Sequence, residues 1–224
     1  MLELKNFSNF ILKDISFILE KNENLLILGE NGAGKSTLAK VLSNLLPSSN
    51  LFFESKNIKD LSSYDRAKYI NYIPSRFEIF DEYLNVLEYL KLSIIEEKNI
   101  EDIEKIISLL KLEDIKLNSC VDLSSGEQQL LLLASALLHN AKITIFDELT
   151  ANLDLNRVKD VFDILNSSLL SQKIVITHNL DFAYALKDFK VLFLQKGSLK
   201  FFGSHSEFFI QENLNIFYSE NLKL

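Results

Sequence analysis

The sequence predicts an α/β fold built on a mainly parallel sheet, and three observations lead to that prediction. Short apolar segments typical of strands alternate with segments whose apolar residues recur at helical spacing. A glycine-rich segment at residues 29–37 lies between one such strand and the helix that follows it. A later apolar strand ends in two acids, Asp147 and Glu148, at the end of a strand where open α/β sheets bind ligands.

Composition narrows the class of protein. The chain has 224 residues, of which 47% are hydrophobic and 25% charged, so we expect one domain over residues 1–224 with a core of its own. Cys120 is the only cysteine, which excludes an internal disulfide and favours a reducing compartment.

The net charge of −7 disfavours a broadly basic nucleic-acid surface. The apolar run Leu130–Leu138 is far shorter than the roughly 20 residues of a membrane span, and the first residues lack a signal-peptide pattern. We therefore expect a soluble, intracellular protein that does not bind nucleic acid.

In the first third of the chain, alternating or uniformly apolar runs predict strands, and leucines at helical spacing predict helices. The predicted strands are residues 2–7, 10–19, 25–28, 51–53 and 70–73, and the predicted helices are residues 35–46 and about 62–68. The Ser8-Asn9 pair is the expected turn between the first two strands. The segment from Pro47 to Asn50 ends the first helix.

The middle of the chain differs in pattern. From Val86 to about Lys116 it contains no Gly or Pro and repeats apolar residues at helical period, which predicts a helical subdomain over approximately residues 76–128. Strands and helices alternate again beyond it. The later predicted helices are residues 130–138, about 156–170 and 180–186, and the later predicted strands are residues 143–146, 174–177 and 191–194.

The glycine-rich segment fits the pattern GxxxxGK[ST]. Its residues are Gly29, Glu30, Asn31, Gly32, Ala33, Gly34, Lys35, Ser36 and Thr37. Glycines let the backbone wrap closely around phosphate oxygens, and the following helix N-terminus adds partial positive charge. We expect Lys35 to reach the β- and γ-phosphates and the Ser36 hydroxyl to bind Mg²⁺. A glycine-rich turn with an incidental lysine is the alternative, but the strand before and the helix after favour a nucleotide phosphate site.

The acid pair supplies the second part of the expected site. Asp147 can hold Mg²⁺ beside the phosphate loop, and Glu148 can accept a proton from an attacking water. Taken alone, the pair could equally be acids that close a strand near a helix N-cap. The phosphate loop upstream favours the metal and base roles.

Three further segments are informative about function because of their order along the chain. Residues 123–129 read LSSGEQQ, a small-residue loop at a helix N-terminus that could bind the γ-phosphate of ATP. Its alternative is an ordinary capping box between Ser124 and Glu127. The segment Ala151-Asn152-Leu153-Asp154 follows the acid pair, and Thr177-His178 closes the next strand.

Together these segments resemble those of ATP-binding cassette (ABC) ATPases over essentially the whole chain. The resemblance implies an α/β core with an antiparallel β part and a helical subdomain that carries the signature loop, LSGGQ in the family. It implies ATP and Mg²⁺ as cofactors and a dimer of two ATPase subunits that encloses two ATP molecules. Each ATP would then meet the phosphate loop of one subunit and the signature loop, with Ser124 and Gly126, of the other. Closure on ATP and opening after hydrolysis would move transmembrane permease subunits.

The resemblance also assigns roles to single residues. It implies Lys35, Glu148 and His178 as catalytic residues, with His178 as the switch histidine at the γ-phosphate. It implies Asp154 as part of the D-loop, which crosses the dimer interface.

Softer matches resemble one branch of the family, the importer ATPases for iron–siderophore, haem and vitamin B12 chelates. They are residues 60–74, residues 178–183 and residues 203–218. The Gly-Arg-x-Pro of that group is absent after the Q-loop. The branch implies import of a metal chelate, a substrate-binding protein as a further partner, and a peripheral location on the cytoplasmic face of the inner or plasma membrane.

The chain departs from the family pattern at four places. Ser75 stands where the Q-loop glutamine would contact Mg²⁺, so a contact through water is expected from its shorter side chain. Ser125 replaces a glycine of the signature and crowds the γ-phosphate approach, and Leu149 replaces a proline. The N-terminal segment is shortened, which leaves two candidates for the aromatic that stacks on adenine: Phe10 first and Phe7 second, either of which could be a core residue.

Two alternatives to a transporter subunit stay open at this point. One is a soluble ABC ATPase outside transport, although the chain lacks a long coiled-coil insertion or a duplicated cassette. The other is a degenerate module that senses nucleotide without turnover, which Ser75 and Ser125 favour and Glu148 opposes. Because Lys35, Asp147, Glu148 and His178 are all present, slow but genuine hydrolysis is expected.

Overall fold

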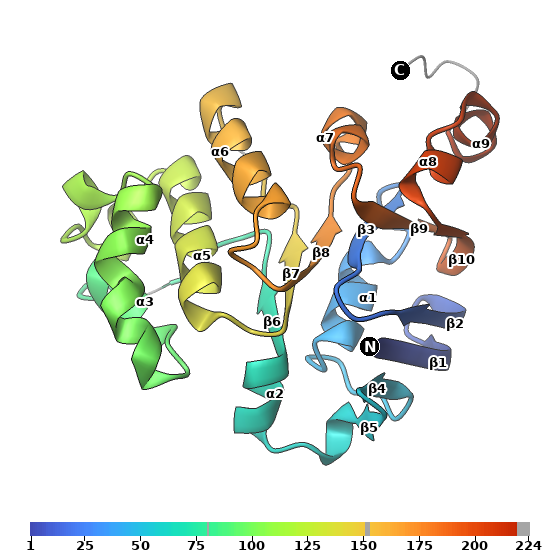
Figure 1. Cartoon of the computed structure of the whole chain (residues 1–224), viewed down its shortest axis with the longest axis horizontal. Coiled ribbons are helices and arrows are strands. Elements are labelled where there is room, and N and C mark those ends of the chain that lie inside the picture. Colours follow the sequence, from blue (N-terminus) through green and yellow to red (C-terminus); the bar gives the residue numbers. More distant parts are fainter. Residues whose placement is uncertain (80, 151–152, 219–224) are drawn as a thin grey trace. The chain divides into compact units, whose positions relative to one another are not determined.

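The computed structural model of the protein describes residues 1–79, 81–150 and 153–218 (Figure 1). The chain forms two compact units. The first unit combines Met1–Arg66 with the chain from Gln172 onward, and the second is Ala67–Ser171. The helical subdomain expected over residues 76–128 lies wholly within the second unit.

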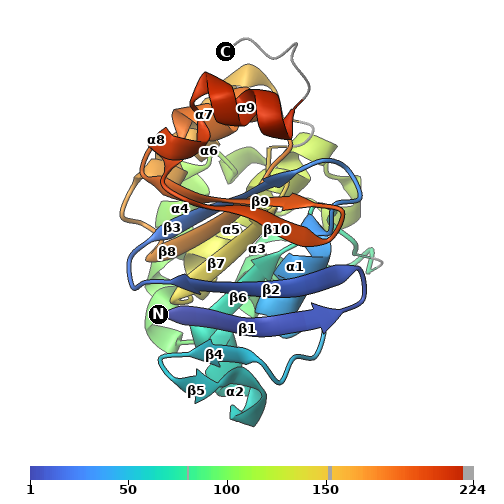
Figure 2. The same ribbon diagram turned by 90° about the vertical axis from the view of Figure 1, so that its right-hand side faces the viewer.

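The first unit is built on a mixed sheet. Its strands are β1 (Leu2–Asn9), β2 (Leu12–Leu19), β3 (Asn24–Gly29), β4 (Leu51–Phe53), β5 (Lys56–Asn57), β8 (Gln172–Ile176), β9 (Phe189–Gln195) and β10 (Ser198–Gly203), in the order β5-β4-β1-β2-β10-β9-β3-β8. β3 runs parallel to β8 and β9, while β1 pairs antiparallel with β2 and β4 (Figure 2). Leu25 to Leu28 of β3 are all 0% exposed, which agrees with the uniformly apolar pattern of a strand covered on both faces.

Short helices complete the first unit. They are α1 (Lys35–Leu42), a 3₁₀ turn at Ile58–Asp60, α7 (Leu180–Ala185), α8 (His205–Phe208) and α9 (Gln211–Phe217), and α2 (Ser63–Tyr69) spans the boundary between the two units. α9 packs on the sheet through aromatic rings: Phe217 stacks on Phe208 with ring centroids 5.5 Å apart and lies 4.6 Å from Phe193 of β9. Phe193 and Phe208 are both 0% exposed, so these rings form part of the core.

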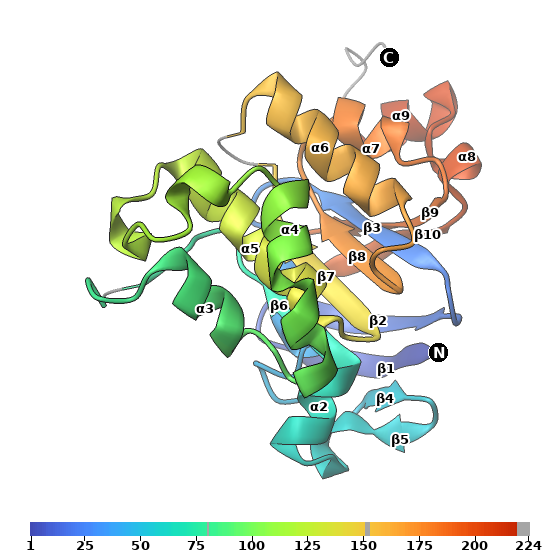
Figure 3. The same ribbon diagram turned by 60° about the vertical axis from the view of Figure 1, so that its left-hand side comes forward.

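The second unit pairs two parallel strands with a group of helices. Its elements are β6 (Ile70–Ile73), α3 (Val86–Leu92), 3₁₀ turns at Glu97–Asp102, Glu113–Ile115 and Cys120–Asp122, α4 (Ile103–Leu109), α5 (Ser125–His139), β7 (Ile143–Asp147) and α6 (Leu155–Asn166). α5 contacts both α3 and α4 (Figure 3). Every residue of Gln129–Leu138 is buried, so α5 is enclosed around its whole circumference rather than along one stripe.

The predicted α/β class is confirmed, and most predicted elements are present, but the first turn was misplaced. Residues 8 and 9 belong to β1, and the turn lies at Phe10 and Ile11. Phe10 takes a left-handed backbone (φ 57°), and its amide donates to Asn9 Oδ1 at 2.8 Å. The left-handed residue that makes this tight turn is invisible in the hydrophobic pattern.

The first predicted helix also ends earlier than expected, at Leu42 rather than at residue 46. Asn44 adopts a left-handed backbone (φ 57°), and asparagine tolerates that conformation better than other non-glycine residues. Within the described residues, no helix has both the length and the apolar character needed to cross a membrane.

Cys120 is fully buried. Burial, with a further contribution from the charge of Glu88, raises the pKa of its thiol to about 11. Because the thiolate is the reactive form, we expect the native protein not to react with a thiol reagent such as 5,5′-dithiobis(2-nitrobenzoate) at pH 8. One thiol per chain should react after unfolding in guanidinium. Rapid labelling of the native protein would contradict this burial.

Candidate functional site

The phosphate loop connects β3 to α1 in the first unit. Gly32 and Gly34 have φ of +78° and +106°, a region that side-chain-bearing residues adopt only with strain. At Gly29 a Cβ would collide with the carbonyl oxygen of Leu194 on the neighbouring strand β9. The glycines are therefore required by backbone geometry, as the sequence motif predicted.

Lys35 holds this loop in shape. It is only 6% exposed, and its ammonium donates to the carbonyl oxygens of Gly29 at 2.9 Å and Glu30 at 3.0 Å. Ser36 and Glu30 are exposed, as are Asn31 and Gly32 between them. The Ser36 hydroxyl thus lies in the first turn of α1 and open to solvent.

His178 leaves the same edge of the first unit as the phosphate loop. β3 and β8 are parallel, with Ile27 opposite Ile176, and the two segments follow the carboxyl ends of these strands. Thr177 Oγ1 accepts the amide of Asn179 at 3.0 Å. Asn179 in turn caps α7 by accepting the amide of Phe182 at 3.0 Å. The exposed His178 ring is thereby placed on a fixed backbone at the edge that binds ligands in parallel sheets.

The β9–β10 turn is hydrogen-bonded to the phosphate loop. Sequence reasoning missed this contact. The amide of Gly197 donates to the carbonyl of Ala33 at 3.1 Å, and the Gly197 carbonyl accepts the amide of Lys13 at 2.8 Å. Ala33 is 3% exposed. The turn thus joins the phosphate loop to the β1–β2 hairpin.

The two aromatic candidates for adenine stacking have different surroundings. Phe7 is 5% exposed within β1, so it is a core residue. Phe10 is 52% exposed in the hairpin turn, next to Ile11, whose side chain lies against Gly34. Phe10 is the candidate with a ring face available for a ligand, and its stacking role stays a prediction.

In the second unit, Asp147 ends β7 and is 2% exposed. The hydroxyl of Tyr72 on the adjacent strand β6 donates to Asp147 Oδ2 at 3.0 Å. Burial, and then the charge of Asp147, raise the pKa of Tyr72 well above its usual value, so the phenol remains a donor at any working pH. Tyr72 orients the carboxylate that the sequence predicted as the metal ligand, and only the pairing of β6 with β7 reveals it.

Glu148 has a left-handed backbone, with φ of 55°. This conformation is uncommon for a glutamate and is found preferentially at functional sites, where the surrounding structure imposes it. The half-buried Glu148 follows a fully buried strand, β7. The strain sets the direction of the side chain expected to act as base.

A Tyr72→Phe substitution tests the orienting bond. Hydrogen bonds to charged groups contribute about 1.5–3 kcal/mol, so we expect the Mg²⁺ concentration for half-maximal ATP turnover to rise about 10- to 100-fold. Tyr89→Phe is the matched control, because Tyr89 is a half-buried tyrosine of the same unit that is hydrogen-bonded to Ser135. A Mg²⁺ titration that is the same for Tyr72→Phe and for the parent would contradict the role.

The signature loop contains the capping box that was its alternative interpretation. The amide and the hydroxyl of Ser124 both donate to Glu127 Oε2, at 2.8 Å and 2.6 Å. Glu127 therefore has a lowered pKa, with the side-chain and backbone hydrogen bonds from Ser124 as the main causes. The capping box fixes the start of α5, with Ser124 and Ser125 exposed and Gly126 half-buried. A role toward ATP of a second subunit stays a prediction.

Asp154 is the N-cap of α6. Its Oδ1 accepts the amides of Asn156 at 2.9 Å and Arg157 at 3.0 Å, and its other oxygen lies 3.6 Å from Arg157 Nε. The rest of the predicted D-loop includes Ala151 and Asn152, which lie outside the described residues.

Ser75 is tied to the helix that follows the signature loop. Gln129 of α5, which is 3% exposed, donates its side-chain amide to the Ser75 carbonyl at 3.0 Å. The backbone at the expected Q-loop position is thus fixed to α5. A contact of the Ser75 side chain with Mg²⁺ stays a prediction.

The donor set fits Mg²⁺. Among the described residues, no three or more His, Cys, Asp and Glu side chains cluster to hold a metal. Mg²⁺ needs no such cluster, because it is usually held by one or two protein oxygens, phosphate oxygens and water. The Ser36 hydroxyl of the first unit and the Asp147 carboxylate of the second unit are each an oxygen of this kind, and their binding of one common ion stays a prediction.

A glycine-rich loop between a parallel strand and a helix, with a buried lysine over its carbonyls, defines a P-loop nucleotide-binding protein. The sequence profile of the ABC transporter family matches residues 12–151. An uncharacterised ABC transporter ATP-binding protein of Methanocaldococcus jannaschii is 34% identical over 85% of this chain and 78% of its own. A probable iron chelatin transport ATP-binding protein of Helicobacter pylori is 31% identical over 80% of this chain and 77% of its own. A dimeric ATP-binding cassette solved with ADP and phosphate superimposes with a TM-score of 0.79 at 21% identity, over 92% of this chain and 99% of the other.

The chain belongs to the ABC transporter family, as its ATP-binding subunit with ATPase activity. The family interpretation of the sequence motifs and the expected cassette fold are thereby confirmed.

Proposed function

We propose that this chain is the ATP-hydrolysing subunit of an importer for a metal chelate of the iron–siderophore, haem or cobalamin type. The main support for a metal chelate as the cargo is the 31% identity to the Helicobacter pylori iron chelatin relative over most of both chains. The three segments at residues 60–74, 178–183 and 203–218 support the same branch.

The catalytic step assigns one task to each residue. Backbone amides of the phosphate loop bind the phosphates of ATP. The Lys35 ammonium leaves the carbonyl oxygens of Gly29 and Glu30 and binds the β- and γ-phosphate oxygens instead. Ser36 and Asp147 would hold Mg²⁺, which would offset the negative charge that builds on the phosphates. Tyr72 fixes the orientation of the Asp147 carboxylate through its hydrogen bond to Oδ2.

Glu148 acts as the general base. A water oxygen forms a bond to the γ-phosphorus while the bond from that phosphorus to the β–γ bridging oxygen breaks. The water proton passes to the Glu148 carboxylate, and ADP leaves with the bridging electrons. His178 contacts the γ-phosphate and senses its loss.

A second copy of the chain completes each site in this proposal. Ser124 and Gly126 of one copy reach the γ-phosphate bound to the phosphate loop of the other, and Asp154 lies at the interface between them. The proposed membrane partners are permease subunits, with a substrate-binding protein delivering cargo. The chain then works as a peripheral subunit on the cytoplasmic side of the membrane.

The test uses the complex purified from native membranes through a tag on this chain and reconstituted in vesicles. We expect ATP-dependent uptake of a ferric siderophore, haem or cobalamin, and no uptake with the Glu148→Gln complex. Uptake of spermidine but of no chelate would overturn the cargo class. ATP turnover by a chain that copurifies with no multi-span protein would indicate the soluble alternative. ATP binding without turnover in the assembled complex would indicate the sensing module.

A further inference from the structure

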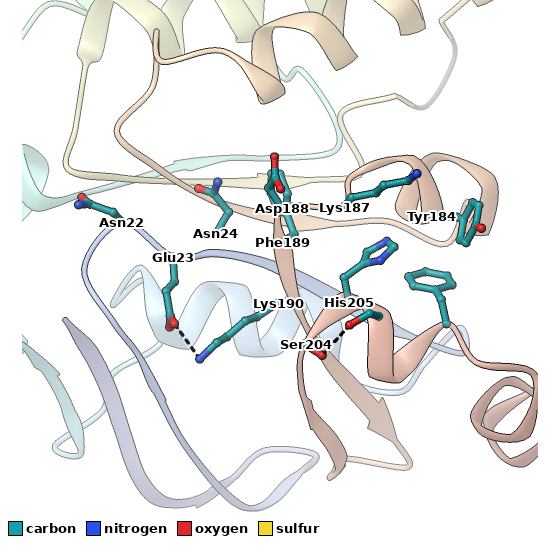
Figure 4. Close-up of a pocket in the computed structure, with 12 residues that line it drawn as sticks. Asn22, Glu23, Asn24, Tyr184, Lys187, Asp188, Phe189, Lys190, Ser204 and His205 are labelled. Atoms are coloured by element: carbon teal, nitrogen blue, oxygen red, sulfur yellow. Dashed lines mark hydrogen bonds and ion pairs between the residues drawn. The ribbon is translucent and has the colours of Figure 1, made fainter.

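A cavity of about 600 Å³ opens in the first unit at the amino ends of β3 and β9 (Figure 4). It lies at the opposite ends of these strands from the phosphate loop, which follows Gly29. Its volume is typical of small-molecule sites. No residue that lines it belongs to the proposed nucleotide machinery. The lining residues used below are Glu23, Tyr184, Lys187, Asp188, Lys190, His205 and Phe209.

One end of the cavity is polar and carries both signs of charge. Glu23 and Lys190 form an ion pair at 2.8 Å, with side chains 30% and 34% exposed. Burial alone would raise the pKa of Glu23, but hydrogen bonds from Lys190 and from the amide of Glu20 lower it overall. The Glu23 carboxylate is therefore charged at neutral pH, and Lys190 matches its charge.

The other end is aromatic. Phe209 lies 4.4 Å from the His205 ring and 5.4 Å from the Tyr184 ring, measured between centroids. His205 is 8% exposed, and a ring nitrogen is 3.2 Å from the carbonyl oxygen of Ala183. Burial lowers its pKa, so the ring is neutral at pH 7. This wall accepts a flat, uncharged group.

Two exposed neighbours add a second pair of charges. Lys187 and Asp188 both line the cavity, and neither forms an ion pair within the part of the chain that the structure describes. Glu23 and Lys190 match each other's charge, so Lys187 and Asp188 are the ammonium and the carboxylate that the cavity presents to a ligand. A balanced set of this kind suits a ligand that carries one charge of each sign.

We propose that this cavity binds a free aromatic amino acid. The carboxylate of the ligand is held by Lys187, its ammonium by Asp188, and its ring packs on Phe209 and Tyr184. A ligand with only one charge would leave either Lys187 or Asp188 unmatched. A ligand without a ring would leave the aromatic wall uncovered. The proposal is independent of the proposed function, because it requires neither ATP nor a membrane partner.

Isothermal titration calorimetry on the full chain, with L-phenylalanine as the probe, tests the ligand class. We expect saturable binding, and at least tenfold weaker binding of 3-phenylpropionate, 2-phenylethylamine and L-alanine. These lack the ammonium, the carboxylate and the ring, respectively. Equal affinity for all four compounds, or no binding of L-phenylalanine up to about 10 mM, a Kd limit well above the usual range for such sites, would overturn the proposal.

Variants locate the site. Phe209→Ala and Asp188→Asn are each expected to weaken L-phenylalanine binding about tenfold, while Lys200→Ala, an exposed lysine of β10 outside the cavity, leaves it unchanged. Asp188 is exposed, so this variant remains informative if Phe209→Ala folds poorly. Saturating ATP should not displace L-phenylalanine. Displacement by ATP, or parent-like binding by Asp188→Asn, would place the ligand elsewhere and overturn the proposal.

Discussion

Replacing Glu148 by glutamine is expected to lower ATP turnover by about 10²–10⁴-fold, the range that a general base contributes. The amide cannot accept the proton of the attacking water, while its size and its left-handed backbone (φ 55° in the parent) stay the same. ATP affinity should change by less than about twofold, since the substitution touches neither the phosphate loop nor Asp147. Steady-state phosphate release and a nucleotide-binding titration measure the two quantities.

The control for this variant is Glu113→Gln, an exposed glutamate of the same unit in a 3₁₀ turn. It removes one carboxylate without touching β7, so turnover should equal that of the parent. Turnover by Glu148→Gln within a few-fold of the parent would assign the base elsewhere. Loss of ATP binding together with turnover would indicate damage to the strained backbone rather than loss of a base.

The residues proposed to contact phosphate could be named from the sequence because their chemistry is local. Gly29 to Thr37 form one continuous segment in which each residue type follows from its position between a strand and a helix. Asp147 was found for the same reason, since a buried strand that ends in an acid is readable from a few residues. Ser124 shows where prediction from a short local pattern ends. The same few residues are compatible with a helix cap and with a signature loop, and the structure contains the cap.

The residues that support this chemistry could not be predicted because their partners are far away in the sequence. Tyr72 reaches Asp147 across 75 residues through the pairing of β6 with β7. Gln129 reaches Ser75 across 54 residues. No periodicity in either segment encodes these contacts. A single sequence shows the strands but not which of them are neighbours.

Gly197 combines the two situations. Its hairpin turn could be predicted from the local sequence, but its contact with the phosphate loop could not. Lys196 and Gly197 separate two apolar runs and have φ of 49° and 81°, as the two central residues of a type I′ hairpin require. The pair predicts the β9–β10 hairpin that our sequence reading omitted. Its contact with the phosphate loop, which joins residues 197 and 33, could come only from the fold.

A Gly197→Ala substitution should therefore affect both folding and nucleotide binding. The new Cβ would overlap the carbonyl oxygen of Ile11, and an alanine at φ +81° is strained whatever the space. Strain and overpacking together predict a loss of about 2–5 kcal/mol in the free energy of unfolding. For a chain of this size the melting temperature should fall by about 5–15 °C. Relief of the clash must move the turn away from Ile11, and so from Ala33, whose carbonyl accepts the Gly197 amide.

The effect of the substitution on ATP affinity distinguishes a glycine that supports the phosphate loop from a glycine that is needed only for folding. Well below the melting temperature of the variant, we expect ATP affinity to be at least about tenfold weaker, a difference of ~1.4 kcal/mol. Gly203→Ala is the matched control, because its Cβ would meet only the side-chain ends of Phe201 and Glu207 and its φ is not positive. The Gly197 residue connects Lys13 to Ala33 through two backbone hydrogen bonds. Its displacement should therefore loosen the loop whose amides we propose to bind phosphate. Parent-like ATP affinity in a destabilised Gly197→Ala would show instead that the phosphate loop keeps its shape without the β9–β10 turn.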